Sequence, residues 1–143
     1  RFVASEKDLE EAADDYKARG ITDVLLSPHI EGDLVKFYGV EDTDFFHLYY
    51  PTRGACFSKF GLERFNGSPT GYAFSESALK KSADACAAVS GFTVYGGDAV
   101  VRPDGSFLII DFNDWPSFSR CCDEAAEAIA ERLRKIIKAK HRI

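Results

Sequence analysis

The stretch that most constrains how this chain can fold is TVYGGDAVVRPDGSFLIIDFNDWPSF, residues 93–118. Residues 93–101 and 106–112 are rich in Val, Ile, Phe and Tyr, which favour β-strands. Between these segments, Pro103, Asp104 and Gly105 form a sequence typical of a tight turn. The stretch therefore predicts an antiparallel hairpin that belongs to the core of the domain.

Three oxygen-bearing side chains interrupt this apolar hairpin. Because side chains alternate across a strand, Asp111 and Asn113 are expected on one face, with Ile110 and Phe112 on the other. If the strands pair tightly around the turn, Asp98 lies near Asp111 and Asn113. Carboxylate and amide oxygens suit Mg²⁺, which completes its shell with water and substrate phosphate. The hairpin thus predicts a metal site of Asp98, Asp111 and Asn113; the alternative is that these residues cap turns.

Length and composition indicate one globular domain. The chain has 143 residues, of which 45% are hydrophobic and 29% charged, so it can bury a core. No apolar run approaches the roughly 18 to 20 residues of a membrane span. The net charge is −5 and no basic stripe occurs outside the last predicted helix, so nucleic acid is not an expected partner. The 4 cysteines lack CxxC spacing, which indicates reduced thiols and predicts a cytoplasmic location.

The chain before the hairpin predicts a helix followed by three strands. Residues 6–20 combine a narrow apolar stripe with many acidic groups, which predicts a surface helix lying across a sheet. Residues 23–30, 34–40 and 44–50 are rich in β-forming residues and are joined by short turns, so they are expected to be antiparallel neighbours. Lys36, in the middle strand, is consistent either with the solvent side of the sheet or with a cleft in which it reaches a phosphate.

The rest of the chain predicts a long loop and two more helices. In the loop, residues 51–74, Arg53, Lys59 and Arg64 are either cations for an anionic substrate or solvated charges. Helices are expected over 75–90 and 123–140. The core face expected for the last helix consists of Ala126, Ile129, Ala130, Leu133, Ile136 and Ile137. The predicted fold class is α+β, an antiparallel sheet with helices packed on one face.

The hairpin resembles the metal-binding element of the ATP-grasp superfamily. The resemblance lies in a strand that carries Asp98, a turn, and a strand that ends in Asp111-x-Asn113 followed by Pro and an aromatic, IDFNDWPSF. It is similar to members with Asp-x-Asn in place of Glu-x-Asn, among them the inositol-phosphate kinases. Upstream, an apolar strand, a Glu-Gly linker and a strand with Lys-x-Tyr are similar to the central ATP-grasp segment. The agreement runs in order from the hinge to the last helix, which identifies the chain as similar to the C-terminal lobe.

This resemblance implies a site for ATP and Mg²⁺. Residues 27–30 match the hinge beside the adenine, where backbone groups would contact the base although Ser27-Pro28 replaces the usual Gln-Glu pair. An acidic residue just beyond the hinge would lie near the ribose, and Lys36 would face the phosphates. The residues implied for nucleotide binding are Ser27, His29, Ile30, Glu31, Asp33 and Lys36. The implied metal ligands are Asp98, Asp111 and Asn113.

The implied chemistry is transfer of the γ-phosphoryl group of ATP. The acceptor is either a carboxylate that then condenses with an amine or thiol, or an inositol-type hydroxyl, so both a ligase and a kinase are open and the small-molecule substrate is unknown. The chain begins at Arg1 and contains no Met, which predicts that the single domain over 1–143 is a fragment of a longer chain. The resemblance implies that an N-terminal lobe is missing, so the fragment is expected to be inactive alone. Apolar surface that this lobe would cover is expected to favour self-association, with a homo-dimer as one form. The alternative is a non-catalytic interaction domain whose acidic hairpin is structural and whose aromatic residues 45–50 form an interface.

Overall fold

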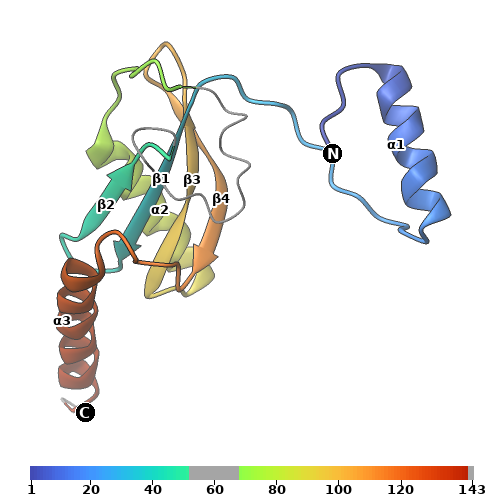
Figure 1. The fold of residues 1–143 in the computed structure, drawn as a ribbon. Coiled ribbons are helices and arrows are strands. Elements are labelled where there is room, and N and C mark those ends of the chain that lie inside the picture. The colour runs from blue at the N-terminus through green and yellow to red at the C-terminus, as the bar shows by residue number, and fades with distance from the viewer. Residues whose placement is uncertain (52–67, 142–143) are drawn as a thin grey trace.

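Four antiparallel strands and three helices make up the part of the chain that the structure, a computed structural model, describes: residues 1–51 and 68–141. In chain order the elements are α1 (Glu6–Ala18), β1 (Asp33–Val40), β2 (Phe46–Tyr49), α2 (Glu76–Ser90), β3 (Val94–Val101), β4 (Phe107–Asp114) and α3 (Cys122–Lys140). The sheet order is β2-β1-β3-β4, with α2 across one face and α3 beside the end of β1 and β2 (Figure 1). The predicted α+β class with an antiparallel sheet is confirmed.

The hairpin of β3 and β4 forms as predicted around the turn at 102–106. The amide of Arg102 donates to the carbonyl of Ser106 at 2.8 Å, and the Asp104 carboxylate accepts from the Ser106 amide at 2.9 Å. Gly105 adopts the left-handed conformation, with φ 79, that a glycine takes without strain. These local bonds fix the register of the two strands, and the register decides which polar side chains meet.

The core lies between α2 and one face of the sheet. On α2, Leu79, Ala83 and Ala87 recur every four residues and are fully buried, as expected for one face of a helix. They pack in one cluster with β-strand residues that include Phe37 and Tyr95. Because α2 covers this face, the side chains on the opposite face of β1, β3 and β4 are left for other roles.

Gly97 permits the close packing of this core. A methyl group added at Gly97 would lie 2.1 Å from the Asp111 carbonyl oxygen and 2.8 Å from the Phe37 ring. Gly97 is therefore a position of β3 that has no room for a side chain.

The segment predicted as the first strand, residues 23–30, is not a strand. It runs as an extended connection between α1 and β1, and no described strand pairs with it. Leu25 is 93% exposed and Leu26 is 65% exposed, so the apolar run that predicted a buried strand has no cover here. An isolated strand cannot satisfy its backbone groups or bury its side chains, and Pro28 removes one donor.

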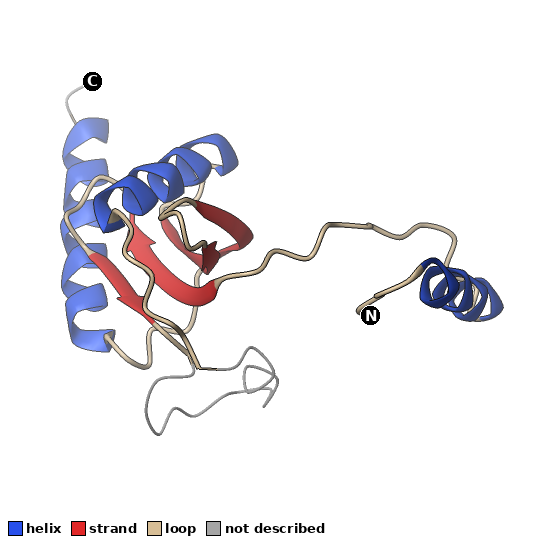
Figure 2. Cartoon of the chain, turned by 90° about the horizontal axis from the view of Figure 1, so that it is seen from above, coloured by secondary structure: helices blue, strands red, loops and turns tan. Residues whose placement is uncertain are grey.

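Helix α1 does not lie across the sheet, contrary to the prediction. It starts at the expected cap, where the Ser5 hydroxyl accepts from the Asp8 amide at 3.2 Å. It then stands apart from the sheet and α2, at the far end of the extended segment (Figures 1 and 2). Its local sequence fixes the helix, whereas its position depends on the segment that follows.

Helix α3 meets the body with a face that overlaps only in part with the predicted one, since Ile129, Ala130 and Ile136 are half-buried and Ala126 is exposed. Ala125 and Ala128 are buried, whereas Leu133 is 50% and Ile137 is 54% exposed. The guanidinium of Arg132 donates at 2.6 Å and 3.2 Å to the two acidic residues that follow β1. Small alanines and the ion pairs of Arg132 fix one face of α3 against the body, with Ile129 and Ile136 half-buried and Leu133 and Ile137 pointing away. None of the helices described is long and apolar enough to pass through a membrane.

Candidate functional site

The four strands place a row of polar side chains across the face that α2 does not cover. Lys36 on β1 is the register partner of Tyr49 on β2 and of Asp98 on β3. Asp98 is in turn the partner of Asp111 on β4. Register partners on antiparallel strands point to the same face, with Cβ atoms about 4.5 to 5.5 Å apart. Lys36, Asp98 and Asp111 are far apart in the sequence but are thus neighbours in one row across the sheet.

Lys36 and Asp98 form the closest pair in this row. The ammonium Nζ of Lys36 donates to Oδ1 of Asp98 at 2.8 Å and to Oδ2 at 3.0 Å. Both side chains are partly buried, with 23% and 22% of their surface exposed. Lys36 therefore lies on the uncovered face of the sheet, beside the predicted metal ligand Asp98. The ammonium there is a fixed point charge with access to solvent.

Asp111 and Asn113 continue the row on β4. The side-chain amide of Asn113 donates to Oδ2 of Asp111 at 2.5 Å, so the two residues lie side by side as predicted. Asn113 stands opposite Gly96, which presents no side chain. Both residues are exposed, which leaves their remaining oxygens open to a ligand.

A β-bulge places Ile110 on this face as well. Asp98 pairs with Asp111, but Ala99 pairs with Ile109, so Ile110 is an extra residue in β4. Ile110 is 54% exposed and lines the same hollow as Asp98. The prediction that Ile110 and Phe112 share the face opposite Asp111 is therefore wrong for Ile110, whereas Phe112 does pack against the core.

A surface pocket adjoins Asp98 and is closed on one side by the extended segment. Its volume is about 870 Å³. Four of the residues implied for nucleotide binding line it: Ser27, His29, Ile30 and Glu31. Leu34 and Ile110 provide apolar surface in the same pocket. The His29 ring is held edge-on against Phe2 at 5.2 Å between ring centroids. The structure thus places the predicted hinge beside Asp98, whereas Lys36, Asp111 and Asn113 do not line this pocket.

Asp33 does not belong to this site. It is 5% exposed, on the core side of β1. Its carboxylate accepts backbone N–H bonds from Thr70 at 2.7 Å, Gly71 at 2.6 Å and Tyr72 at 3.0 Å. The implied role beside the ribose is therefore wrong for Asp33, because its oxygens anchor the chain that leads into α2. Glu31, the other acidic residue implied for that role, lines the pocket.

An aromatic cluster at the β2 side of the face was missed by the sequence reasoning. The hydroxyl groups of Tyr38 and Tyr49 are 3.0 Å apart, and the Tyr38 and His47 rings are stacked with centroids 6.3 Å apart. The guanidinium of Arg120 lies 4.3 Å above the Tyr49 ring. The alternation of His47 and Tyr49 was the available signal, but their pairing with Tyr38 depends on the register. This cluster extends the polar row from Lys36 toward β2.

The donor types in the row fit a magnesium ion. Asp98 and Asp111 supply two carboxylates and Asn113 an amide oxygen, the hard ligands that Mg²⁺ takes. No group of three or more His, Cys, Asp or Glu side chains arranged for a metal occurs in the described part of the chain. A magnesium ion here would therefore need water and phosphate as further ligands, and it would compete with the Lys36 ammonium for Asp98.

The cysteines of the described residues form no disulfide. Cys86, Cys121 and Cys122 are free thiols. Burial raises the pKa of the Cys121 thiol, so it is less nucleophilic than an exposed cysteine. The cations predicted in the long loop, Arg53, Lys59 and Arg64, lie outside the described residues.

No known protein-family model, curated protein or solved structure matches this chain.

Proposed function

We propose that this chain is the Mg²⁺- and ATP-binding lobe of an ATP-grasp enzyme that transfers the γ-phosphoryl group of ATP to a small molecule. One observation carries the proposal: Lys36, Asp98 and Asp111 stand in register across β1, β3 and β4, on the face that α2 leaves uncovered. The hinge segment 27–31 borders the same face. The sequence resemblance requires this juxtaposition, and a structural acidic hairpin does not.

The pocket supports a nucleotide in size and chemistry. Ligand pockets in proteins typically measure about 300 to 1,000 Å³ and combine apolar walls with a few polar groups. The pocket of about 870 Å³ has Leu34 and Ile110 as apolar walls and Asp98 at the end nearest the row. An adenine placed against 27–30 would have its phosphates directed toward Lys36 and Asp98. Glu31 would then be the acidic residue within reach of the ribose.

Each residue of the row has a distinct task in this proposal. The Lys36 ammonium attracts the phosphates as a point charge and is positioned by Asp98 before the nucleotide arrives. Asp98, Asp111 and Asn113 hold the magnesium ion, whose charge neutralises the phosphate oxygens. The side-chain oxygen of Asn113 is available to the metal while its nitrogen donates to Asp111. The metal would compete only with the Lys36 ammonium, for the Asp98 carboxylate.

The proposal leaves two acceptors of the phosphoryl group open, and each acceptor defines a different reaction class. A carboxylate acceptor makes the enzyme a ligase and a hydroxyl acceptor makes it a kinase. The described residues supply one wall of the nucleotide site, and a ligand on one wall keeps much of its surface in water. We therefore expect the 143-residue chain to bind Mg²⁺-ATP weakly, near millimolar, where the free energy of binding is about 4 kcal/mol.

The test is a titration of the chain with ATP, with and without Mg²⁺, followed by NMR, which measures millimolar constants. Asp111→Asn removes one anionic ligand and should weaken Mg²⁺-dependent binding by about tenfold, or about 1.4 kcal/mol. Asp14→Asn, the same substitution on the exposed surface of α1, is the matched control and should bind as the wild type does. Equal affinity of the wild type and Asp111→Asn, or affinity that ignores Mg²⁺, would contradict the proposal.

A second candidate is a non-catalytic interaction domain. It is favoured by the exposed apolar side chains of Val24, Leu25, Leu26 and Trp115, of which Trp115 is 69% exposed. In that case the Lys36–Asp98 ion pair is purely structural. A thermal-shift experiment separates the two candidates, because a ligand that binds the native state raises the free energy of unfolding by RT ln(1 + [L]/Kd). At a Mg²⁺-ATP concentration of ten times Kd, the free energy of unfolding of a nucleotide-binding lobe rises by about 1.4 kcal/mol, whereas that of an interaction domain does not rise.

A further inference from the structure

Helix α3 carries an apolar stripe on the side that the body does not cover. Ala126, Ala130, Leu133 and Ile137 recur at spacings of four, three and four residues, which places them in one line along the helix. Ala126 is exposed, and about half of the surface of Leu133 and Ile137 is exposed, 50% and 54%. The face of α3 against the body is formed instead by residues such as Ala125 and Ala128. The stripe therefore has heptad spacing and is separate from the face of α3 that contacts the body.

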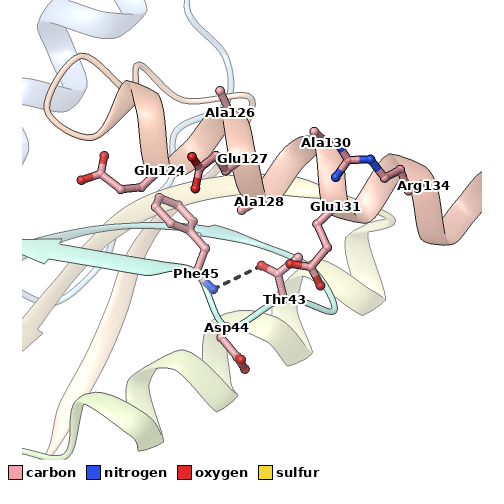
Figure 3. Close-up of a pocket in the computed structure, with 10 residues that line it drawn as sticks. All are labelled: Thr43, Asp44, Phe45, Glu124, Ala126, Glu127, Ala128, Ala130, Glu131 and Arg134. Carbon is pink, nitrogen blue, oxygen red and sulfur yellow. Dashed lines mark hydrogen bonds between the residues drawn. The ribbon is translucent and has the colours of Figure 1, made fainter.

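The side chains of the stripe are small at one end of the helix and large at the other. Ala126 and Ala130 occupy its first half, and Leu133 and Ile137 its second half. A hollow of about 680 Å³ lies beside the small end, lined by Ala126, Ala130 and Phe45 among others. Figure 3 shows Ala126 and Ala130 in line along α3, with Phe45 below the helix. The small end therefore offers space, and the large end offers side chains of the kind that fill such space.

The charges on α3 are also divided between its two ends. The first half carries Asp123, Glu124, Glu127 and Glu131, and the second half carries Arg132, Arg134, Lys135, Lys138 and Lys140. Glu127 and Arg134 stand one position after Ala126 and Leu133, so both flank the stripe on the same side. Both also line the hollow (Figure 3).

We propose that a second copy of this chain packs on the stripe, with the two α3 helices antiparallel about a two-fold axis. In this arrangement Ala126 meets Ile137 of the partner and Ala130 meets Leu133 of the partner, so each small end receives a large one. Glu127 of each helix then faces Arg134 of the other, twice by symmetry. A parallel pairing would set the acidic half on the acidic half and large side chains on large ones. The proposal does not depend on the nucleotide site.

The experiment is sedimentation equilibrium of the full 143-residue chain over a range of protein concentrations. The wild type should show a reversible monomer–dimer equilibrium. Glu127→Arg puts two arginine pairs at the interface and should raise the dimer dissociation constant about tenfold or more. Combining Glu127→Arg with Arg134→Glu restores opposite charges across the axis and should return the dissociation constant toward the wild-type value. Circular dichroism on each variant shows that the monomer fold is kept.

A second pair of variants tests the apolar contacts. Leu133→Ser removes the large side chain from the seam and should also weaken the dimer at least tenfold. Val89→Ser is the matched control, because Val89 on α2 is 91% exposed and lies outside the stripe. It should leave the dissociation constant unchanged. A chain that is monomeric at every concentration, a dimer indifferent to Glu127→Arg and Leu133→Ser, or a double variant no better than the single one would overturn the proposal.

Discussion

Asp33 provides the sharpest test of how this fold is held together. Its carboxylate accepts three backbone N–H bonds, from Thr70, Gly71 and Tyr72, and the residue is 5% exposed. These bonds tie the start of β1 to the chain that enters α2. The variant Asp33→Asn keeps the shape of the side chain but has one oxygen and one amide group where the wild type has two oxygens.

The cost of Asp33→Asn follows from these contacts. If the side-chain oxygen of the variant still accepts from the Gly71 and Tyr72 amides, these two hydrogen bonds then have a neutral acceptor in place of a charged one. Each bond then contributes about 1 kcal/mol less to the free energy of unfolding. The amide then faces the Thr70 N–H, a donor against a donor, which costs about 2 kcal/mol for the unsatisfied group. The expected loss in the free energy of unfolding is therefore about 4 kcal/mol. This is a large fraction of the stability of a domain of this size.

The assay for Asp33→Asn is urea unfolding followed by circular dichroism. With a slope of about 1.5 kcal/mol per molar urea, a loss of about 4 kcal/mol lowers the midpoint by about 2.5 M. Asp111→Asn is the control on the same sheet, because its carboxylate is exposed, and its midpoint should stay within about 0.5 M of the wild type. A shift below about 0.5 M for Asp33→Asn would refute the view that Asp33 is an anchor, and a selective loss of ATP affinity would return it to the nucleotide site.

Two further predictions concern the core. Gly97→Ala should destabilise the domain by about 2 kcal/mol or more, measured by the same urea unfolding, because the new methyl group would lie 2.1 Å from the Asp111 carbonyl oxygen and force β3 and β4 apart; wild-type stability would contradict the tight register. For Tyr95, burial first and then the Asp84 carboxylate raise the pKa of the phenol above its ordinary value, and the hydroxyl donates to Asp84 at 2.5 Å. Because the neutral phenol is favoured in the folded state, this stability is fully present below about pH 10 and is lost as the pH rises above it. Tyr95→Phe should lower stability by about 1 kcal/mol near pH 7 and should be less sensitive to high pH than the wild type; identical pH profiles would count against this account.

The hairpin and its polar residues could be predicted because their signals are local. The Pro-Asp-Gly turn sets the pairing, and alternation along β4 brings Asp111 and Asn113 together, as the structure shows. The neighbours of Lys36 cannot be predicted from its own strand, because they depend on which strand lies beside β3. In the structure β1 lies beside β3, and Lys36 is the register partner of Asp98.

The parts that were wrong depend on information that a local pattern does not contain. Residues 23–30 have the composition of a strand, but a strand needs a neighbour, and none of the described strands pairs with them. The bulge that exposes Ile110 shifts the alternation by one residue without any special local sequence. Asp33 was assigned to the ligand because it follows a Glu-Gly linker, whereas its partners are about 37 to 39 residues away in the chain. On α3, the ion pairs of Arg132 with Glu41 and Asp42 help to decide which face meets the body, and Leu133 and Ile137 are left exposed.

The measurement that tests the central proposal most directly is paramagnetic broadening of amide signals by Mn²⁺-ATP, with Mn²⁺ in place of Mg²⁺. The proposal predicts broadening centred on the amides of Asp98, Asp111 and Asn113, with Lys36, Ser27 and residues 29–31 also affected and with weaker broadening of the α2 residues Ala83 and Ala87 on the opposite face of the sheet. Mg²⁺-ATP in excess should reverse it. Broadening centred instead on the acidic first half of α3, or no broadening beyond that caused by Mn²⁺ without ATP, would contradict a nucleotide and metal site on the open face of the sheet.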